Sequence, residues 1–422
     1  MTGGRLRSRL AVHGRALVTG GLALGVFAIG WAGLHTGFYR DGQVIDTPTY
    51  QRYGDAIANT LVPYRDFGLE YPPAALPVFA MPAVLRPIEG DLSSYQRWFE
   101  AEMFVCGALS LVLMLVVLIR LDADPLRLRL ALGLAAGAPL LIGPVILSRF
   151  DLWPATLTVC ALAALIVDRN RLSAGVLGVG FAAKLYPAVL LPVALAWVWK
   201  RRGGREAAID LAIFAAIALA CFLPFLIIAP HGVWDALTRQ TNRPLQIESL
   251  GAGVLLVVHA ITGFAITMQP GYGSQNLVGS VADTLPIVQT TVQLMAIAGV
   301  WIWFARGPAE PDRLVRAWAA AVCAFVAFGK VLSPQFLIWL IPLIPLVRGR
   351  RGFWAGGLLA ASLVLTQLWF PRHYWDLALR FAPVESCLVL ARDLALVALL
   401  AVLVLPTRRN RFRSGQRPAV VS

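Results

Sequence analysis

Long apolar runs alternate with short polar clusters along almost the whole chain. A run of roughly 20 apolar residues is long enough to cross the hydrocarbon core of a bilayer. Lipid offers no hydrogen-bond partners, so we expect each run to be a helix that satisfies its own backbone. The pattern predicts an all-α integral membrane protein, a bundle of about twelve transmembrane helices joined by polar loops.

Composition and charge agree with this fold class. Hydrophobic residues make up 58% of the 422 residues and charged residues only 14%, whereas a soluble chain carries about a quarter charged residues. The net charge of +14 does not indicate nucleic-acid binding, because the basic residues form short clusters between apolar runs. Such clusters are typical of loops retained in the cytoplasm.

The basic clusters also predict an orientation in the plasma membrane. The segments assigned to the cytoplasm are 1–15, 120–129, 168–173, 200–210, 306–316, 348–352 and 407–422. They hold 24 basic and 7 acidic residues, against 12 and 15 in the extracytoplasmic stretches. We therefore expect both termini in the cytoplasm, with a basic N-terminus (1–15), a single transmembrane domain (16–406) and a basic tail (407–422). The run at about 16–34 is long for a signal peptide and lacks a clear A-x-A site, which predicts a retained first span.

The same rule assigns three ambiguous stretches. Residues 74–86 are apolar but short and broken by prolines, so 35–97 is expected to be one long extracytoplasmic loop carrying surface helices. Residues 172–199 should pass in and back as two short half-helices that meet near 184–187. Residues 228–285 form a second large extracytoplasmic region, in which 251–265 either dips into the membrane or lies on its surface.

The first loop holds the densest group of reactive side chains. Pro48 suits the first turn of a helix, and Tyr50 and Tyr53 then share one face of that helix. Asp46 stands at the start of this face, whereas Asp55 is expected to face water or headgroups. The local pattern leaves two interpretations of Asp46 open, a helix cap or a functional carboxylate.

Other candidates follow along the chain. Tyr64, Arg65 and Asp66 precede Glu70, which stands before a double proline either at a helix entrance or as the cap of a turn. Polar groups expected at the outer ends of spans are Arg149, Asp151, Lys184, Tyr186, Arg243, Gln246, Glu248, Lys330, Ser333, Gln335 and His373. External cations beside apolar helices would suit a lipid phosphate. Snorkelling or ion pairing is the alternative for each cation, and Arg149 with Asp151 could simply form a pair.

The sequence indicates no metal site or cofactor. It has no HExxH motif and no His/Cys spacing for zinc. The acids of the first loop are too separated to form a compact cage, so a need for a divalent cation is left undetermined. The Gly-Tyr-Gly at 271–273 does not lie between a strand and a helix and is not a nucleotide loop. Arg392 and Asp393 are expected to pair inside the last span, without an assigned function.

Taken in order, the polar motifs resemble those of glycosyltransferase family 87, a member of the GT-C superfamily of polyprenyl-phosphate-sugar transferases. The segments that carry the resemblance are 46–50 (DTPTY), 62–66 (VPYRD), 70–73 (EYPP), 183–187 (AKLYP), 243–249 (RPLQIES) and 332–335 (LSPQ). The last three are similar to those of actinobacterial members. The resemblance extends from about residue 15 to 405.

This resemblance implies an inverting transfer of a hexose, usually mannose, from a polyprenyl-phosphate donor to a glycolipid or glycan hydroxyl outside the membrane. Asp46 matches the position of the family's essential acid, and a carboxylate there would take the proton of the attacking hydroxyl. Lys184, Arg149, Lys330 and Arg243, in that order, would stabilise the leaving phosphate. The other residues expected to bind substrate or donor are Tyr50, Tyr53, Tyr64, Arg65, Asp66, Glu70, Asp151, Tyr186, Glu248 and Gln335. Gln335 lies where some members carry His, so no histidine role is transferred.

Two other functions fit parts of the pattern. A transporter or lipid flippase would place charges and broken helices at mid-membrane, whereas here most charge lies at the external boundary. An assembly protein without activity would not need the carboxylates and external cations. If the chain is a transferase, Asp46 should face a cavity that opens to the outer leaflet and to water.

Overall fold

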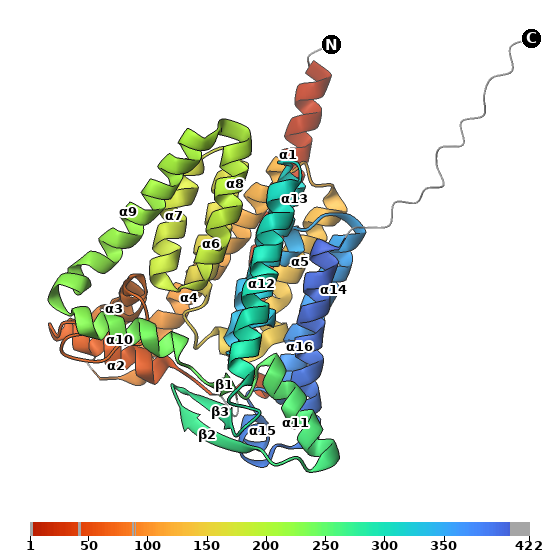
Figure 1. Ribbon diagram of the computed structural model, residues 1–422. Coiled ribbons are helices and arrows are strands. Elements are labelled where there is room, and N and C mark those ends of the chain that lie inside the picture. The colour runs from red at the N-terminus through yellow and green to blue at the C-terminus, as the bar shows by residue number, and fades with distance from the viewer. Residues whose placement is uncertain (1–2, 41–43, 87, 89, 406–422) are drawn as a thin grey trace, which may run out of the picture.

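The computed structural model describes residues 3–40, 44–86, 88 and 90–405. The predicted basic tail 407–422 lies outside the described residues. Helices dominate this part of the chain and run as a bundle with two different ends (Figure 1). The fold class is therefore the one predicted, an all-α polytopic membrane protein.

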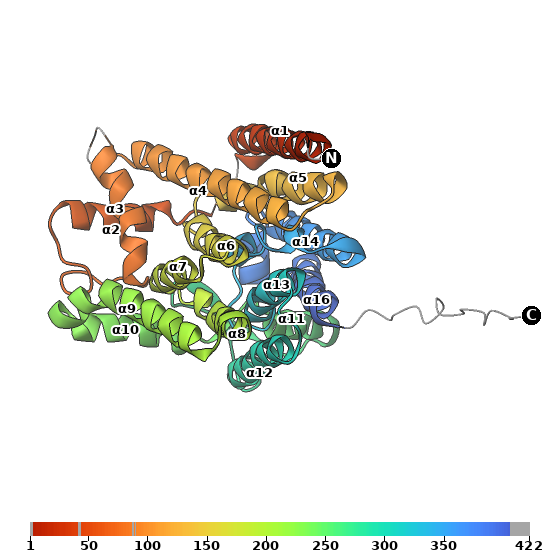
Figure 2. The same ribbon diagram turned by 90° about the horizontal axis from the view of Figure 1, so that it is seen from above.

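Seven helices in the described residues are long and apolar enough to cross a membrane. They are α1 (Gly3–Gly33, apolar from Gly14), α4 (Leu92–Arg120), α5 (Pro125–Ile142, continued by the 3-10 helix η3, Gly143–Ile146), α9 (Gly204–Ile228), α12 (Leu285–Arg306), α14 (Gly349–Trp369) and α16 (Pro383–Val404). Figure 2 shows α1, α4, α9 and α12 at the outside of the bundle. The side chains of α9 and α12 are mostly left uncovered by the rest of the protein, as expected for helices that face lipid.

Five shorter helical segments complete the bundle. They are α6 (Leu152–Ile166), α7 (Asn170–Ala183), α8 (Leu191–Arg202), α13 (Pro311–Ala327) and the pair η5 (Pro334–Trp339) and η6 (Ile344–Leu346). In Figure 2, α6 and α13 lie at the centre, and most side chains of both are buried. As predicted for 172–199, α7 and α8 are two short helices joined by η4 (Tyr186–Leu190). With the seven long helices they make twelve segments in the part of the chain that the structure describes, of which seven are long enough to be counted as candidate spans.

One end of the bundle, here called the surface end, carries the elements that do not run along the bundle (Figure 1). These are α2 (Thr47–Ala58), η2 (Pro73–Ala75), α3 (Leu76–Leu85), α10 (Pro230–Thr241), α11 (Leu250–Thr262), α15 (Tyr374–Arg380) and an antiparallel sheet of order β1-β3-β2, formed by Leu245–Gln246, Ser274–Val278 and Thr267–Gly271. The surface helices α2 and α3 fall in the loop predicted to carry them. That loop ends earlier than expected, because Asp91 caps α4 by accepting from the backbone N–H groups of Ser93 and Ser94.

The position of α2 is fixed by two contacts with α3. At Gly54 the helices touch, since a Cβ there would lie 2.2 Å from the carbonyl oxygen of Phe79. Asp55, expected to face water or headgroups, instead pairs with the buried guanidinium of Arg86 at 2.6 Å. That expectation was wrong because helical periodicity places Asp55 away from the tyrosine face but cannot show that the end of α3 covers it. These contacts hold the start of α2, where Asp46 lies.

Candidate active site

A cavity of about 340 Å³ opens at the surface end, where the short central segments end beneath the first loop and the sheet. Its walls come from parts of the chain that are distant in sequence. The residues predicted from the sequence that line it are Asp46, Glu70, Arg149, Lys184, Tyr186, Arg243, Gln246, Glu248, Lys330, Ser333 and Gln335. The fold therefore gathers most of the predicted polar groups around one space.

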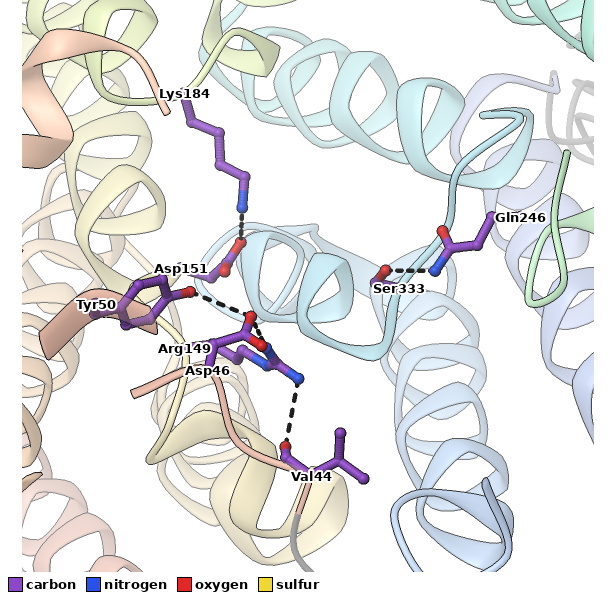
Figure 3. A network of polar contacts seen from close by, with 8 residues as sticks. All are labelled: Val44, Asp46, Tyr50, Arg149, Asp151, Lys184, Gln246 and Ser333. Atoms are coloured by element: carbon purple, nitrogen blue, oxygen red, sulfur yellow. Dashed lines mark hydrogen bonds and ion pairs between the residues drawn. The ribbon is translucent and has the colours of Figure 1, made fainter. Parts of the chain in front are cut away.

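Asp46 lies at the start of α2, but its side chain makes no capping hydrogen bond. Its carboxylate instead contacts the guanidinium of Arg149 and lies 3.4 Å from the hydroxyl of Tyr50 (Figure 3). The Asp46 side chain is 33% exposed and that of Arg149 only 7%. The cap interpretation therefore does not describe this side chain, which faces the cavity.

Asp151 belongs to a second ion pair beneath the cavity. Its Oδ1 accepts from the Lys184 ammonium and from the Trp339 indole N–H, both at 2.6 Å. The possible ion pair between Arg149 and Asp151 does not form. Arg149 pairs with Asp46, and Asp151 pairs with Lys184. Asp151 itself is buried and does not line the cavity.

Aromatic rings enclose the Lys184 ammonium. It lies 4.7 Å from the ring centre of Phe150 and 5.0 Å from that of Trp339. Tyr186 stacks on Trp339 with their ring centres 3.9 Å apart. Rings of this kind exclude water and favour a cation over their faces, so an anion that reached Lys184 would meet a positive charge with little hydration.

Two more cations line the same cavity. Arg243 donates to the Ser274 hydroxyl at 3.0 Å, and burial lowers the pKa of its guanidinium. The Lys330 ammonium donates to the backbone carbonyl of Thr241 at 2.6 Å. Also in the lining, the Gln246 amide donates to the Ser333 hydroxyl at 2.8 Å (Figure 3). Four predicted cations thus line one cavity together with the carboxyl groups of Asp46, Glu70 and Glu248, and the excess of positive charge favours an anionic group.

Glu248 is a buried carboxyl group in the cavity wall. Burial raises its pKa to about 8, although the nearby cations Arg392 and Arg149 oppose this shift. Its Oε2 atom has no hydrogen-bond partner among the described residues. Its backbone carbonyl accepts from Arg392 at 2.7 Å, while the Arg392 side chain pairs with Asp393, as expected.

Several predicted residues lie away from the cavity. Tyr50 and Tyr53 are buried under α2, where Tyr50 stacks on Phe79 with ring centres 4.6 Å apart; only its hydroxyl reaches Asp46. The Tyr64 hydroxyl donates to the carbonyl of Tyr71. The sequence placed Tyr50 and Tyr53 correctly on one face of a helix, but that face packs against α3 and not against the open space.

Arg65 and Asp66 also lie outside the cavity. They form an exposed pair at 2.8 Å, and Asp66 accepts from the backbone N–H of Val62. Arg65 and this N–H lower the pKa of Asp66 to about 2. The two side chains fix the turn that follows α2, so the structure does not bring them to the residues that surround Asp46.

The structure adds lining residues that were not among the candidates. Seven of them are aromatic: Tyr71, Tyr272, Phe325, Phe336, Trp339, Phe370 and Tyr374. Two of these had a signal in the sequence, since Tyr71 stands in the 70–73 motif and the glycines on either side of Tyr272 mark a turn. Among the described residues, no three His, Cys, Asp or Glu side chains form a group that could hold a metal ion.

The sequence model of glycosyltransferase family 87 matches residues 69–334, which is more than half of the chain and begins after Asp46. No curated protein matches the chain by sequence. Among solved structures, ArnT from Cupriavidus metallidurans bound to undecaprenyl phosphate aligns with 96% of this chain and 77% of its own length, at 14% identity and a TM-score of 0.46.

Proposed function

Because the chain belongs to glycosyltransferase family 87, we propose that it transfers a hexose, most simply mannose, from a polyprenyl-phosphate donor to a glycolipid or envelope glycan. The family and the apolar helices make the protein a membrane glycosyltransferase. The donor, the sugar, the acceptor and the catalytic residues belong to the proposal. The alternative of a transporter or lipid flippase is set aside, because the family is one of glycosyltransferases.

The observation that carries the proposal is the arrangement of charge in the cavity. One carboxylate, Asp46, touches the buried cation Arg149, and the enclosed ammonium of Lys184 lies on the same cavity. A polyprenyl phosphate gains negative charge as it leaves the sugar. Fixed cations in a site of low dielectric stabilise that charge more strongly than water does. Arg149 and Lys184 are the proposed phosphate ligands, with Arg243 and Lys330 completing the wall.

Asp46 is the proposed general base. A sugar hydroxyl is a weak nucleophile, so a carboxylate must accept its proton while the new glycosidic bond forms. In the structure the carboxylate is held by Arg149, the same group that would bind the donor phosphate. A donor phosphate that bound the Arg149 guanidinium in place of Asp46 would leave the Asp46 carboxylate free to accept this proton. Attack from the face opposite the phosphate inverts the anomeric carbon.

The proposal also places the cavity outside the cell. The first residue of α1 and the last of α16 lie at the end opposite the surface end (Figure 1). The predicted cytoplasmic clusters 120–129, 200–210 and 306–316 contain or adjoin helix connections at that same end. With these clusters in the cytoplasm, the surface end faces the extracytoplasmic side.

The test of this function replaces Asp46 by Asn. Purified protein is given a labelled polyprenyl-phosphate mannose and an octyl mannoside acceptor, and the labelled disaccharide is measured. The Asp46→Asn variant should lose transfer by a factor of about 100 or more, since it cannot accept a proton. Asp66→Asn is the matched control, because this second acid of the same loop lies outside the cavity, and it should retain transfer.

Both variants must elute as the wild type does in size-exclusion chromatography and keep its melting temperature within a few degrees. A folded Asp46→Asn protein with unchanged turnover would exclude Asp46 as the base. Absence of sugar transfer by the wild-type protein from any polyprenyl-phosphate donor would contradict the proposed function. That result is the one expected of an assembly protein without activity.

A further inference from the structure

The hairpin formed by β2 and β3 carries an unusual residue at its tip. Gly271 pairs with Ser274, which leaves Tyr272 and Gly273 as a two-residue loop. Both have positive φ angles, 55° and 68°, as a type I′ turn requires. Asn, Asp and Gly are favoured at the first position of this turn, because larger side chains are disfavoured in a left-handed backbone. The geometry of the turn therefore does not explain why a tyrosine stands at this position.

The turn is held rigidly against the cavity. The buried Asn276 donates to the carbonyl of Gly271 at 3.0 Å and accepts from the Ser274 hydroxyl at 3.1 Å. Ser274 in turn accepts from the cavity cation Arg243. These bonds set the height and direction of the hairpin tip, so the position of Tyr272 follows from the sheet.

The ring of Tyr272 has no partner in the described part of the chain. It lines the cavity and is 42% exposed, and no ring, cation or hydrogen-bonding group there contacts its side chain. Aromatic residues deeper in the cavity behave differently, since Tyr186 and Trp339 stack on each other. A large ring held at the mouth of a cavity without a partner offers a free flat surface.

A carboxylate from the first loop lies beside the hairpin tip. Glu70 Oε2 lies 3.6 Å from the position of a Cβ on Gly273, so the hairpin tip reaches the first loop. Its other oxygen accepts from Arg239 at 3.1 Å, and its backbone carbonyl accepts from the Gln240 amide. The mouth thus pairs an open aromatic face with an oriented carboxylate.

We propose that Tyr272 is the stacking platform for a sugar ring of the acceptor, and that Glu70 accepts hydrogen bonds from the hydroxyls of that ring. The C–H groups on one face of a pyranose carry a partial positive charge and suit the negative face of an aromatic ring. The hydroxyls at its edge suit a carboxylate. This inference rests on the proposed function. It assigns the acceptor to the water-facing mouth and leaves the cations deeper in the cavity to the donor phosphate.

The test compares Tyr272→Asn with Tyr272→Phe. Asparagine is favoured in the left-handed conformation, so it removes the ring while keeping the hairpin; phenylalanine keeps the ring. With polyprenyl-phosphate mannose as donor and octyl mannoside as acceptor, Tyr272→Asn should raise the acceptor KM roughly tenfold. The donor KM and the kcat at saturating acceptor should stay near wild type, and Tyr272→Phe should match the wild type in all three.

Trp234→Asn is the control, because Trp234 is an exposed aromatic residue of α10 that does not line the cavity. An unchanged acceptor KM in Tyr272→Asn overturns the inference and leaves Tyr272 as an aromatic residue at the membrane interface. An equal rise in Trp234→Asn overturns it too, since the effect would then come from any surface ring. Absence of transfer by the wild type instead contradicts the proposed function.

Discussion

At the scale of single residues, the site is organised by two ion pairs that share no member. Asp46 holds Arg149 at the cavity, and Asp151 holds Lys184 beneath it. The two carboxylates differ in exposure, 33% for the Asp46 side chain and 1% for that of Asp151. A base must reach a substrate hydroxyl, so the exposed member suits that role. The buried one positions its cation, because its oxygen is already used by Lys184 and Trp339.

The buried carboxyl group of Glu248 should make the stability of the protein depend on pH. Its pKa is raised from the ordinary 4.5 to about 8, chiefly by burial. Between these two values the folded protein keeps a proton that the unfolded chain has lost. The contribution of Glu248 to the free energy of unfolding is therefore fully present below about pH 4.5 and is lost as the pH rises towards 8. The loss amounts to about 1.4 kcal/mol for each unit by which the two pKa values differ.

The melting temperature in detergent should accordingly fall between pH 5 and pH 9. The fall should be smaller in Glu248→Gln, which carries no titrating proton at this position. Glu310→Gln is the control, since Glu310 is exposed between α12 and α13. If Glu248→Gln and wild type lose melting temperature in parallel over this range, the buried carboxyl does not set the pH dependence.

Single residues also show where sequence reasoning stops. Asp46, Glu70, Arg149 and Lys184 stand in polar motifs beside apolar runs, and the expected boundary of each run placed them on one side. Tyr272 and Trp339 have no such motif, because their importance comes from what they touch after folding. Arg149 and Asp151 pair with other residues for the same reason, because nearness in sequence does not determine which charged residues form an ion pair.

At the scale of elements, the contact between α2 and α3 determines where the proposed base lies. A methyl group at residue 54 would meet the carbonyl oxygen of Phe79 at 2.2 Å, a backbone atom that cannot turn away. Gly54→Ala should therefore push α2 from α3, destabilise the protein by about 1–3 kcal/mol and reduce transfer by displacing Asp46.

Gly68→Ala provides the comparison, because no atom lies within 4 Å of a Cβ at Gly68 in the same loop. Melting temperature and disaccharide formation are measured for both variants. Equal values for the two alanine variants would show that the close approach of α2 and α3 does not control the site.

Elements were predictable to different degrees. The long spans follow from apolar length, and the junction of α7 and α8 follows from a charge pattern that requires the chain to return. The sheet was not predicted, because its strands are two to five residues long and include Gly and Pro. Such segments lack the alternation that identifies a strand, and only pairing across the loop forms them.

At the scale of the whole molecule, the twelve segments separate two faces of different chemistry. Their orientation can be tested in a cysteine-free protein, in which Cys106, Cys160, Cys221, Cys323 and Cys387 are replaced. A membrane-impermeant maleimide should label Ser280→Cys, before α12 at the surface end, in intact cells. It should label Glu310→Cys, at the other end of α12, only after the cells are permeabilised. The reverse pattern would mean that the protein has the opposite orientation in the membrane, with the cavity on the cytoplasmic side.

The short central helices have a consequence for how a lipid substrate is handled. The 15 residues of α6 and the 14 of α7 rise about 22 Å, less than the roughly 30 Å of a hydrocarbon core. Asp151 precedes α6 and Lys184 follows α7, so in the proposed orientation helices this short would leave both residues below the outer surface of the bilayer. Pulling a polyprenyl tail into water would cost about 0.8 kcal/mol per methylene. Under the proposed function, the donor phosphate would then reach Lys184 while its tail stays in the lipid, and no extraction work would be required.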